Sequence, residues 1–259
     1  MAKRKKFKPN RKHKKPSFLG FLIKWLFVTA LWIGIFLAGL LAWYASELPA
    51  ITQNAKFERK VAITVQAADG TVIARYGELQ GNSISAKDLP ENLIHAVLSI
   101  EDRRFYHHGG IDPYGLARAV IVNALHGRVA QGGSTITQQL AKNLFLSQER
   151  TLKRKLQEAM LAIWLEQKLS KDEILSAYLN RVYMGSGTYG VEAAAKLYFN
   201  KDVRDISLRE AAMLAGLLKA PSRYSPASNP RLASQRADTV IEAMRDAGYL
   251  EKDGKGAKS

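Results

Sequence analysis

The sequence predicts a mainly α-helical protein, with one transmembrane helix near its start and a small β-hairpin ahead of its main domain. Three observations predict this arrangement. Residues 25–45 form a run of 21 residues without a charged side chain. Two runs rich in β-branched residues flank Asp69-Gly70. Beyond Tyr76 the pattern is helical almost to the end of the chain, with capping signals at several helix starts.

The chain has 259 residues and a formal net charge of +16, which is unevenly distributed. Residues 1–24 contain ten lysines and arginines and no acid, whereas the rest of the chain carries 29 basic and 23 acidic side chains. Because a short basic tail beside an apolar segment is typical of a membrane surface, we expect membrane lipids and no nucleic acid as partners. Cysteine is absent, which excludes disulfide bonds and thiolate metal sites.

Residues 25–45 predict the transmembrane helix. A helix of this length spans about 31 Å, which matches a hydrocarbon core of roughly 30 Å. Trp25 and Trp43 lie near its two ends, where aromatic side chains suit the membrane interfaces. The positive-inside rule then predicts a cytoplasmic tail, residues 1–24, and an extracytoplasmic chain after Glu47. A cleaved signal peptide is the alternative, but the apolar run is long for one and no convincing A-x-A site follows it.

Residues 46–80 predict a linker and the β-hairpin, because Asp-Gly between two β-rich runs is a strong turn signal. Residues 81–248 predict the main helical domain, in which Asp112 and Pro113 mark one helix start. Capping boxes predict three further starts, at Thr135 with Gln138, Ser170 with Glu173, and Ser207 with Glu210. We expect residues 249–259 to be a disordered tail rich in Gly and Lys.

Glu101 is the first candidate catalytic residue. An apolar helical stripe runs from Leu93 to Leu98, and one more turn of the same face reaches Glu101. Burial raises the pKa of a carboxyl group, which suits a general base or acid near neutral pH. The alternative is a glutamate at a helix end that pairs with Arg103 or Arg104 on the surface.

The segment GGSTITQQLAKN, residues 132–143, predicts an anion-binding helix start. Its two glycines permit backbone shapes closed to other residues. Ser134 or Thr135 then caps a helix whose free N–H groups can hold an anion, and Lys142 and Asn143 follow about two turns later. The spacing differs from that of a Walker loop, so an ordinary nucleotide site is excluded. A helix that is merely well capped is the alternative.

Adjacent histidines, His107 and His108, precede two glycines. No second cluster with metal-ligand spacing accompanies them. The sequence therefore favours a structural or substrate-contact role for them over a metal site.

Glu158 is the second candidate acid. It lies on a predicted helix, residues 151–169, where Arg154 and Lys155 precede it by four and three residues and are within reach of its carboxylate. Seven apolar residues, 159–165, follow directly and indicate a buried helix. Charges beside such a segment are costly unless they are paired or used. The functional hypothesis is an acid flanked by cations that hold a diphosphate, and the alternative is a salt bridge that only stabilises the fold.

Five segments of the chain resemble, in order, the five motifs of the peptidoglycan glycosyltransferases, glycosyltransferase family 51. Members of this family occur alone or as the first half of bifunctional penicillin-binding proteins. The resemblance covers roughly residues 90–225. The segments are EDRRFYHHGGID (101–112), GGSTITQQLAKNLFL (132–146), RKLQE (154–158), KDEILSAYLNRVYMG (171–185) and REAAMLAGLLKAPS (209–222).

The resemblance implies a lysozyme-like helical fold with two lobes around a cleft, and an inverting transfer of a glycan from a polyprenyl diphosphate to lipid II. In that reaction Glu101 matches the general base, and Glu158 matches the acid that organises the leaving diphosphate or a divalent cation, Mg²⁺ or Mn²⁺. Lys142, Arg154 and Lys155 match cations near the diphosphate. No organic cofactor is implied.

Further positions match residues that shape or contact the cleft. They are Asp102, Phe105, His108, Thr135, Gln139, Asn143, Asn180 and Tyr183. The implied partners are lipid II, the lipid-linked glycan and other cell-wall synthesis proteins. The implied location is the cytoplasmic membrane, with the catalytic domain on its periplasmic side.

Two features resemble the first half of a bifunctional penicillin-binding protein more than a monofunctional enzyme. They are the Asp69-Gly70 hairpin and the segment AGLLKAPSRYSP. Because the chain has no Ser-x-x-Lys motif, we expect no transpeptidase activity in it. A non-catalytic scaffold and a lytic glycosidase are the rival hypotheses. The two acids argue against the scaffold, and the cations suited to a diphosphate argue against the glycosidase.

Overall fold

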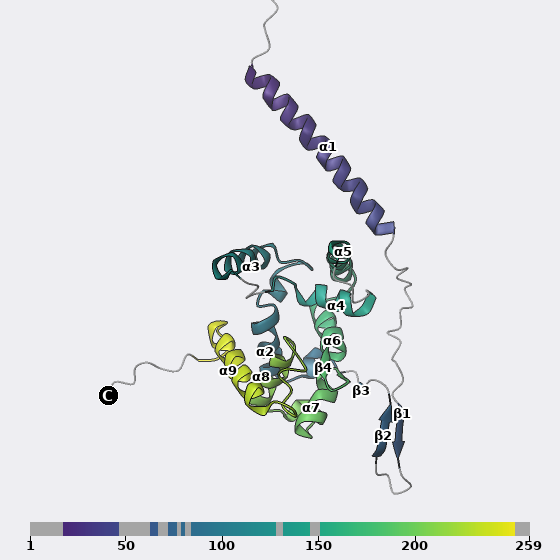
Figure 1. Ribbon diagram of the computed structural model, residues 1–259, viewed down its shortest axis with the longest axis vertical. Coiled ribbons are helices and arrows are strands. Elements are labelled where there is room, and N and C mark those ends of the chain that lie inside the picture. The colour runs from purple at the N-terminus through teal and green to yellow at the C-terminus, as the bar shows by residue number, and fades with distance from the viewer. Residues whose placement is uncertain are drawn as a thin grey trace, which may run out of the picture. The chain divides into compact units, whose positions relative to one another are not determined.

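The computed structural model describes residues 18–46, 63–66, 72–76, 79–80, 84–127, 132–145 and 151–251. The chain divides into two compact units, Met1–Leu48 and Pro49–Ser259. In the first unit the described residues form one helix, α1 (Phe18–Ser46) (Figure 1). Among the residues that the structure describes, no helix is both long and apolar enough to cross a membrane. The transmembrane helix of residues 25–45 therefore stays a prediction.

The second unit is mainly helical, which confirms the predicted fold class at that level (Figure 1). Its strands are β1 (Ile63–Gln66), β2 (Val72–Tyr76), β3 (Leu79–Gln80), β4 (Tyr183–Gly185) and β5 (Thr188–Tyr189). Its α-helices are α2 (Glu91–Glu101), α3 (Pro113–His126), α4 (Ile136–Phe145), α5 (Leu152–Lys168), α6 (Lys171–Arg181), α7 (Val191–Phe199), α8 (Leu208–Leu217) and α9 (Pro230–Asp246). Short 3₁₀ turns lie at Ala86–Asp88, Phe105–His107 and Val203–Asp205.

The strands form two small sheets. β1 and β2 pair in antiparallel fashion, which confirms the predicted hairpin, although its Asp69-Gly70 turn lies outside the described residues. β3 pairs in parallel with β5, and β5 pairs with β4. The segment that leads into the main domain is therefore hydrogen-bonded to a strand, β5, more than 100 residues further along the chain.

The helix starts follow the predicted capping chemistry. Ser170 and Ser207 each form a capping box with the glutamate three residues later, which begins α6 and α8. At α4 the Thr135 N–H donates to the Gln138 side chain over 3.1 Å, and the Gln138 N–H donates to the Thr135 hydroxyl over 3.1 Å. Asp112 is the N-cap of α3, but its carboxylate makes no capping hydrogen bond.

Two sets of helices form the core of the second unit. α2, α8 and α9 pack together, and α4 packs against α5 and α6 (Figure 1). The predicted apolar stripe of α2 is buried, with Leu93 at 0% and Leu98 at 3% exposure. At the other end of the domain the ring of Tyr249 stacks on that of His95 at 4.0 Å, and residues 252–259 of the predicted tail lie outside the described residues. The packing places the end of α2 near the start of α4, where the candidate site lies.

Candidate active site

Glu101 is the last residue of α2 and is partly buried. The Gln139 side-chain amide donates to its carboxylate, with 2.8 Å between Nε2 and Oε2. Burial raises the pKa of Glu101 above its ordinary value, and this effect exceeds the lowering caused by Gln139, Arg236 and Lys142. A carboxylate with a raised pKa is suited to accepting a proton near neutral pH.

The two arginines that follow Glu101 contact other groups. Arg103 donates to backbone carbonyl oxygens of Ser99 at 3.2 Å and Ala243 at 3.3 Å. Arg104 lies 3.9 Å from the carboxylate of Asp112, and its guanidinium lies 4.6 Å from the centre of the Tyr114 ring. These contacts argue against a simple surface pair between Glu101 and its neighbours in the chain.

Glu158 lies on α5 and is almost completely buried, at 2% exposure. Its two carboxylate oxygens each face a cation, Arg154 Nη1 at 3.0 Å and Lys155 Nζ at 2.6 Å. Lys155 also donates to the Ser134 hydroxyl over 2.8 Å. The structure is compatible with both hypotheses for this segment. The salt bridge that would only stabilise the fold is present, and its Lys155 also reaches the glycine-rich segment ahead of α4, as a diphosphate-binding role would need.

A small open pocket lies between the end of α2, the start of α3 and the segment before α4. Its lining residues are Glu101, Asp102, Arg103, Arg104, Asp112, Gly115, Arg118, Gly132, Gly133, Ser134 and Thr135. Since Ser134 lines the pocket and also binds Lys155, the surroundings of Glu101 and Glu158 meet at this hydroxyl. The pocket therefore combines a carboxyl group whose pKa is raised with the positive charges of Arg103, Arg104 and Arg118.

Known proteins resemble this chain in sequence. A family model described as Transglycosylase matches residues 69–245. The chain belongs to the transglycosylase family. It is 48% identical over 212 residues to penicillin-binding protein 1A of Neisseria lactamica, covering 82% of this chain and 26% of that protein. With penicillin-binding protein 1A of Aquifex aeolicus the identity is 51% over 189 residues, covering 73% and 26%.

The chain thus spans about a quarter of the length of these curated relatives. A crystal structure of penicillin-binding protein 1A from Haemophilus influenzae aligns with a TM-score of 0.45 at 24% identity, covering 76% of this chain and 20% of that one. That likeness is too distant to bear on the site.

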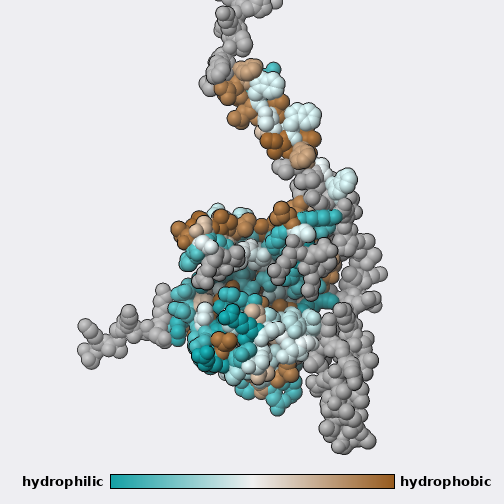
Figure 2. Space-filling model, viewed as in Figure 1, coloured by the Kyte–Doolittle hydropathy of each residue, from teal (hydrophilic) through white to brown (hydrophobic). Residues whose placement is uncertain are grey.

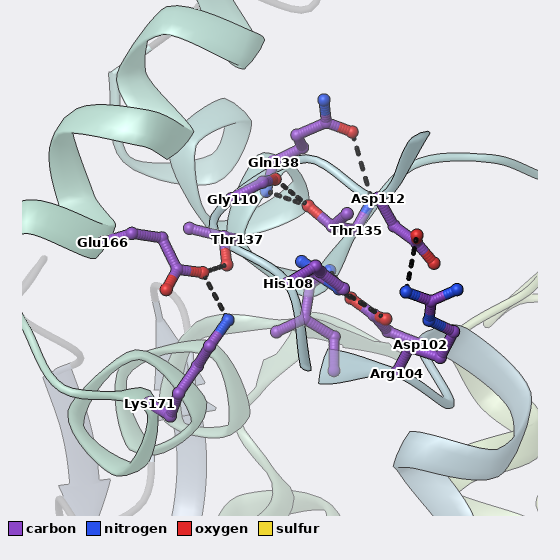
Figure 3. A network of polar contacts seen from close by, with 11 residues as sticks. Asp102, Arg104, His108, Gly110, Asp112, Thr135, Thr137, Gln138, Glu166 and Lys171 are labelled. Atoms are coloured by element: carbon purple, nitrogen blue, oxygen red, sulfur yellow. Dashed lines mark hydrogen bonds and ion pairs between the residues drawn. The ribbon is translucent and has the colours of Figure 1, made fainter. Parts of the chain in front are cut away.

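In this transglycosylase domain the polar network beside the pocket is held mainly by Asp102 and Thr135 (Figure 3). The two carboxylate oxygens of Asp102 lie 2.9 and 3.0 Å from His108 Nε2, and one also accepts from the Ile136 N–H over 3.1 Å. The Thr135 hydroxyl donates to the Gly110 carbonyl over 2.6 Å. These bonds tie the end of α2 and its loop to the start of α4.

Position 110 requires a glycine. Its φ is +77°, and an added Cβ would come within 2.9 Å of the Ala162 backbone on α5. Phe105 is fully buried, and the Lys171 ammonium lies 4.4 Å from the centre of its ring. The loop that closes one side of the pocket is therefore shaped by Asp102, Phe105, His108 and Thr135. Of these four, Asp102 and Thr135 line the pocket itself.

One cluster of possible metal ligands exists among the described residues, and the sequence did not single it out. Ligand atoms of Asp102, His108 and Asp112 all lie within 4.8 Å of one another. In the structure Asp102 binds His108 and a backbone N–H, and Arg104 lies 3.9 Å from Asp112, whereas His108 Nδ1 and Asp112 Oδ1 have no hydrogen-bond partner within the described part of the chain. The cluster therefore acts as a hydrogen-bonded and ion-paired support for the loop.

The remaining predicted residues lie in different surroundings. Lys142 on α4 is partly buried and lowers the pKa of Glu101, whereas Asn143 is exposed. The Asn180 amide accepts from the Ile84 N–H over 3.0 Å and donates to the Ile84 carbonyl over 2.7 Å, so it fixes the backbone ahead of α2. Tyr183 on β4 is 37% exposed and packs on Tyr189 with 5.0 Å between the rings. Substrate contact by these four residues stays a prediction.

Sequence reasoning missed two groups at the site. Arg118, an exposed cation on α3, lines the pocket. An exposed arginine on a helix looks like an ordinary solvated residue, so only its place about one and a half helix turns beyond Asp112-Pro113 could have singled it out. Tyr178 lies in the segment KDEILSAYLNRVYMG but is not among the predicted site residues; it is fully buried and donates to Gln139 Oε1 over 3.2 Å.

Proposed function

We propose that this chain is a peptidoglycan glycosyltransferase. It polymerises lipid II into β-1,4-linked glycan strands, with inversion at the donor carbon and release of polyprenyl diphosphate. One observation carries the proposal: Glu101, whose pKa is raised, lines the same pocket as Ser134, which accepts a hydrogen bond from Lys155, the partner of Glu158. The match of residues 69–245 to the transglycosylase family supports it.

The reaction follows from these groups. Glu101 accepts the proton of the acceptor's 4-hydroxyl, whose oxygen attacks the anomeric carbon of the donor. The bond from that carbon to the diphosphate oxygen breaks, and the negative charge that develops there is stabilised by Lys155 and Arg154 and, from α4, by Lys142. Glu158 keeps Lys155 and Arg154 in place through contacts of 2.6 and 3.0 Å.

The divalent cation expected near Glu158, Mg²⁺ or Mn²⁺, does not fit that residue as a ligand. Both carboxylate oxygens of Glu158 already face cations, and the group is buried at 2% exposure. A metal ion there would have to displace Arg154 or Lys155. The proposed reaction therefore uses the positive side chains for charge stabilisation and takes no step through a metal ion or an organic cofactor.

We also propose attachment to the cytoplasmic membrane through residues 25–45, with the N-terminus cytoplasmic and the catalytic domain periplasmic. The uncharged run lies within the single helix α1, and exposed apolar side chains lie along it. α3 also exposes Tyr114, Val120, Ile121 and Leu125, and Figure 2 has a hydrophobic surface where Figure 1 places this helix. Anchoring enzyme and lipid substrate to one surface raises their effective concentration.

The two groups of helices are, in this proposal, the lobes of a lysozyme-like fold, with the pocket as part of the cleft. The relatives named penicillin-binding protein 1A favour the glycosyltransferase part of a bifunctional protein over a monofunctional enzyme. Lipid-linked glycan, membrane lipids and other cell-wall synthesis proteins are the proposed partners.

Purified protein incubated with labelled lipid II tests the function. We expect a ladder of long glycan strands on a gel and release of polyprenyl diphosphate in step with polymer. Short fragments from added peptidoglycan would instead support a glycosidase, and absence of any product would support a scaffold. Deleting residues 1–45 should release the protein from the membrane fraction, and complete retention would assign the attachment to another segment, such as α3.

A further inference from the structure

Three side chains from three helices form a continuous hydrogen-bonded chain that ends on Glu101. The hydroxyl of Tyr178 on α6 donates to Gln139 Oε1 over 3.2 Å. The Nε2 of the same Gln139, on α4, donates to Glu101 Oε2 over 2.8 Å. Both polar ends of the amide are thus occupied, one by a phenol and the other by the proposed base.

We propose that Tyr178 is a positioning residue that fixes the orientation of the Gln139 amide and thereby sets the protonation of Glu101. This inference rests on the proposed function, because it concerns the base of that reaction. Tyr178 itself touches neither substrate nor pocket, since its side chain is fully buried and it does not line the pocket.

The orientation follows from the donor and acceptor inventory. A tyrosine hydroxyl that donates needs an acceptor, which only the Oε1 end of the amide supplies. If the amide rotated by half a turn, its oxygen would face the carboxylate of Glu101 and its NH₂ group would face the Tyr178 hydroxyl. The rotated amide would set two acceptor oxygens against each other and would leave the Tyr178 proton without this acceptor. Gln139 is therefore held with its donor towards the base.

Tyr178 is suited to this task because it stays protonated. Burial and, after it, the negative charge of Glu101 raise the pKa of the phenol well above its ordinary value. The hydroxyl therefore remains a donor throughout the pH range in which Glu101 titrates. In a buried chain of hydrogen bonds the members polarise one another, so the Tyr178–Gln139 bond and the Gln139–Glu101 bond are expected to strengthen each other.

Other groups act on Glu101 through space and not through this chain. Arg236 from α9 and Lys142 from α4 lower its pKa, whereas burial and Asp102 raise it. Arg103, Arg104 and Arg118 line the same pocket. None of these charges changes when the Tyr178 hydroxyl is removed, so its contribution can be measured separately.

The test is Tyr178→Phe, which removes one oxygen and keeps the ring. Gln139 then loses the hydrogen bond that orients its amide. Its hydrogen bond to Glu101 is formed for less of the time, and the pKa of Glu101 rises by about one unit. In the pH profile of kcat/KM for labelled lipid II, the acid limb should move to higher pH by the same amount. Below the original limb kcat/KM should fall about tenfold, and at high pH it should be unchanged, because one pKa unit is a tenfold change in the ionised fraction.

Tyr198→Phe is the matched control. It also deletes a tyrosine hydroxyl that donates over 3.0 Å, here to the Met184 carbonyl, and whose other contact is the Ser186 hydroxyl, so neither bond involves Gln139 or Glu101. A general loss of packing or stability would affect both variants, but only Tyr178→Phe should move the acid limb. Thermal unfolding of each variant checks that the fold is retained.

Gln139→Leu, alone and combined with Tyr178→Phe, completes a double-mutant cycle. We expect it to shift the limb at least as far as Tyr178→Phe does, and we expect the added Tyr178→Phe change to cause no further shift in that background. An equal shift in both backgrounds would overturn the inference, because Tyr178 would then act on Glu101 without Gln139. If Tyr178→Phe fails to fold, a Gln139→Leu variant whose limb stays at the wild-type pH overturns it equally.

Titration of the Glu101 carboxyl by ¹³C NMR separates this inference from the proposed function. The pKa of Glu101 in Tyr178→Phe should exceed that in Tyr198→Phe and in the wild type whether or not lipid II is polymerised. An inactive wild-type protein with this shift would reject the glycosyltransferase and keep the positioning role. An unchanged Glu101 titration in an active enzyme would reject the positioning role alone.

Discussion

The two glutamates of the site lie in opposite surroundings. Glu101 accepts one hydrogen bond from a neutral amide and has its cations, Arg236 and Lys142, acting through space. Glu158 is more deeply buried and contacts two cations directly, at 2.6 and 3.0 Å. The difference teaches that one residue type suits two tasks, because a carboxylate that no cation contacts directly can accept a proton, whereas one between two cations can hold them in place.

Glu101→Gln tests the first half of this comparison and should have the largest effect. We expect polymerisation of lipid II to fall by about 10²–10⁴-fold, because the amide cannot accept the proton. The rate of glycan formation from labelled lipid II measures this, and circular dichroism checks the fold. Near-normal turnover would remove Glu101 as the base.

Lys155→Ala tests the second half. It removes the ammonium that binds both Glu158 and Ser134, so kcat/KM should fall by about 10²-fold. The acid limb of the pH profile should stay in place, because the base is unaltered. Lys196→Ala, an exposed lysine on α7, is the control, and an equal loss in both variants would contradict a local role.

Glu158→Gln should differ from Glu101→Gln in stability. It leaves Arg154 and Lys155 without their counter-charge, and we expect a loss of about 3 kcal/mol, at the low end for a buried pair because Lys155 is partly exposed. Urea unfolding of both variants at neutral pH measures the contrast. Equal stability of the two variants would show that the environments do not differ as described.

The smallest expected effect is the pH dependence of stability in Glu101→Gln. Because burial raises the folded-state pKa of Glu101, the wild type gains stability from this residue below its unfolded pKa and loses it as the pH rises through the folded value. The variant should therefore unfold at a slightly higher temperature than the wild type at neutral pH, and the gap should close near pH 4. A gap that widens on acidification would reverse the sign of the shift.

Much of the local structure could be predicted from neighbours in the chain. The capping boxes at Ser170 and Ser207 form as expected, since each joins residues three apart. The pairing of Arg154 and Lys155 with Glu158 follows in the same way from helical spacing. Burial of Glu101 at the end of the α2 stripe also agrees with the periodicity.

The connections between distant segments came only from the tertiary structure. Gln139 reaches Glu101 across 38 positions and Tyr178 reaches Gln139 across 39. Ser134 meets Lys155, and β3 pairs with β5, only because α4, α5 and the small sheet pack as they do. The sequence by itself thus determined where several helices begin and predicted Glu101 and Glu158 as candidate acids, because both depend on local spacing. Packing alone decided which amide faces the base, because a hydrogen bond between helices depends on how their faces meet.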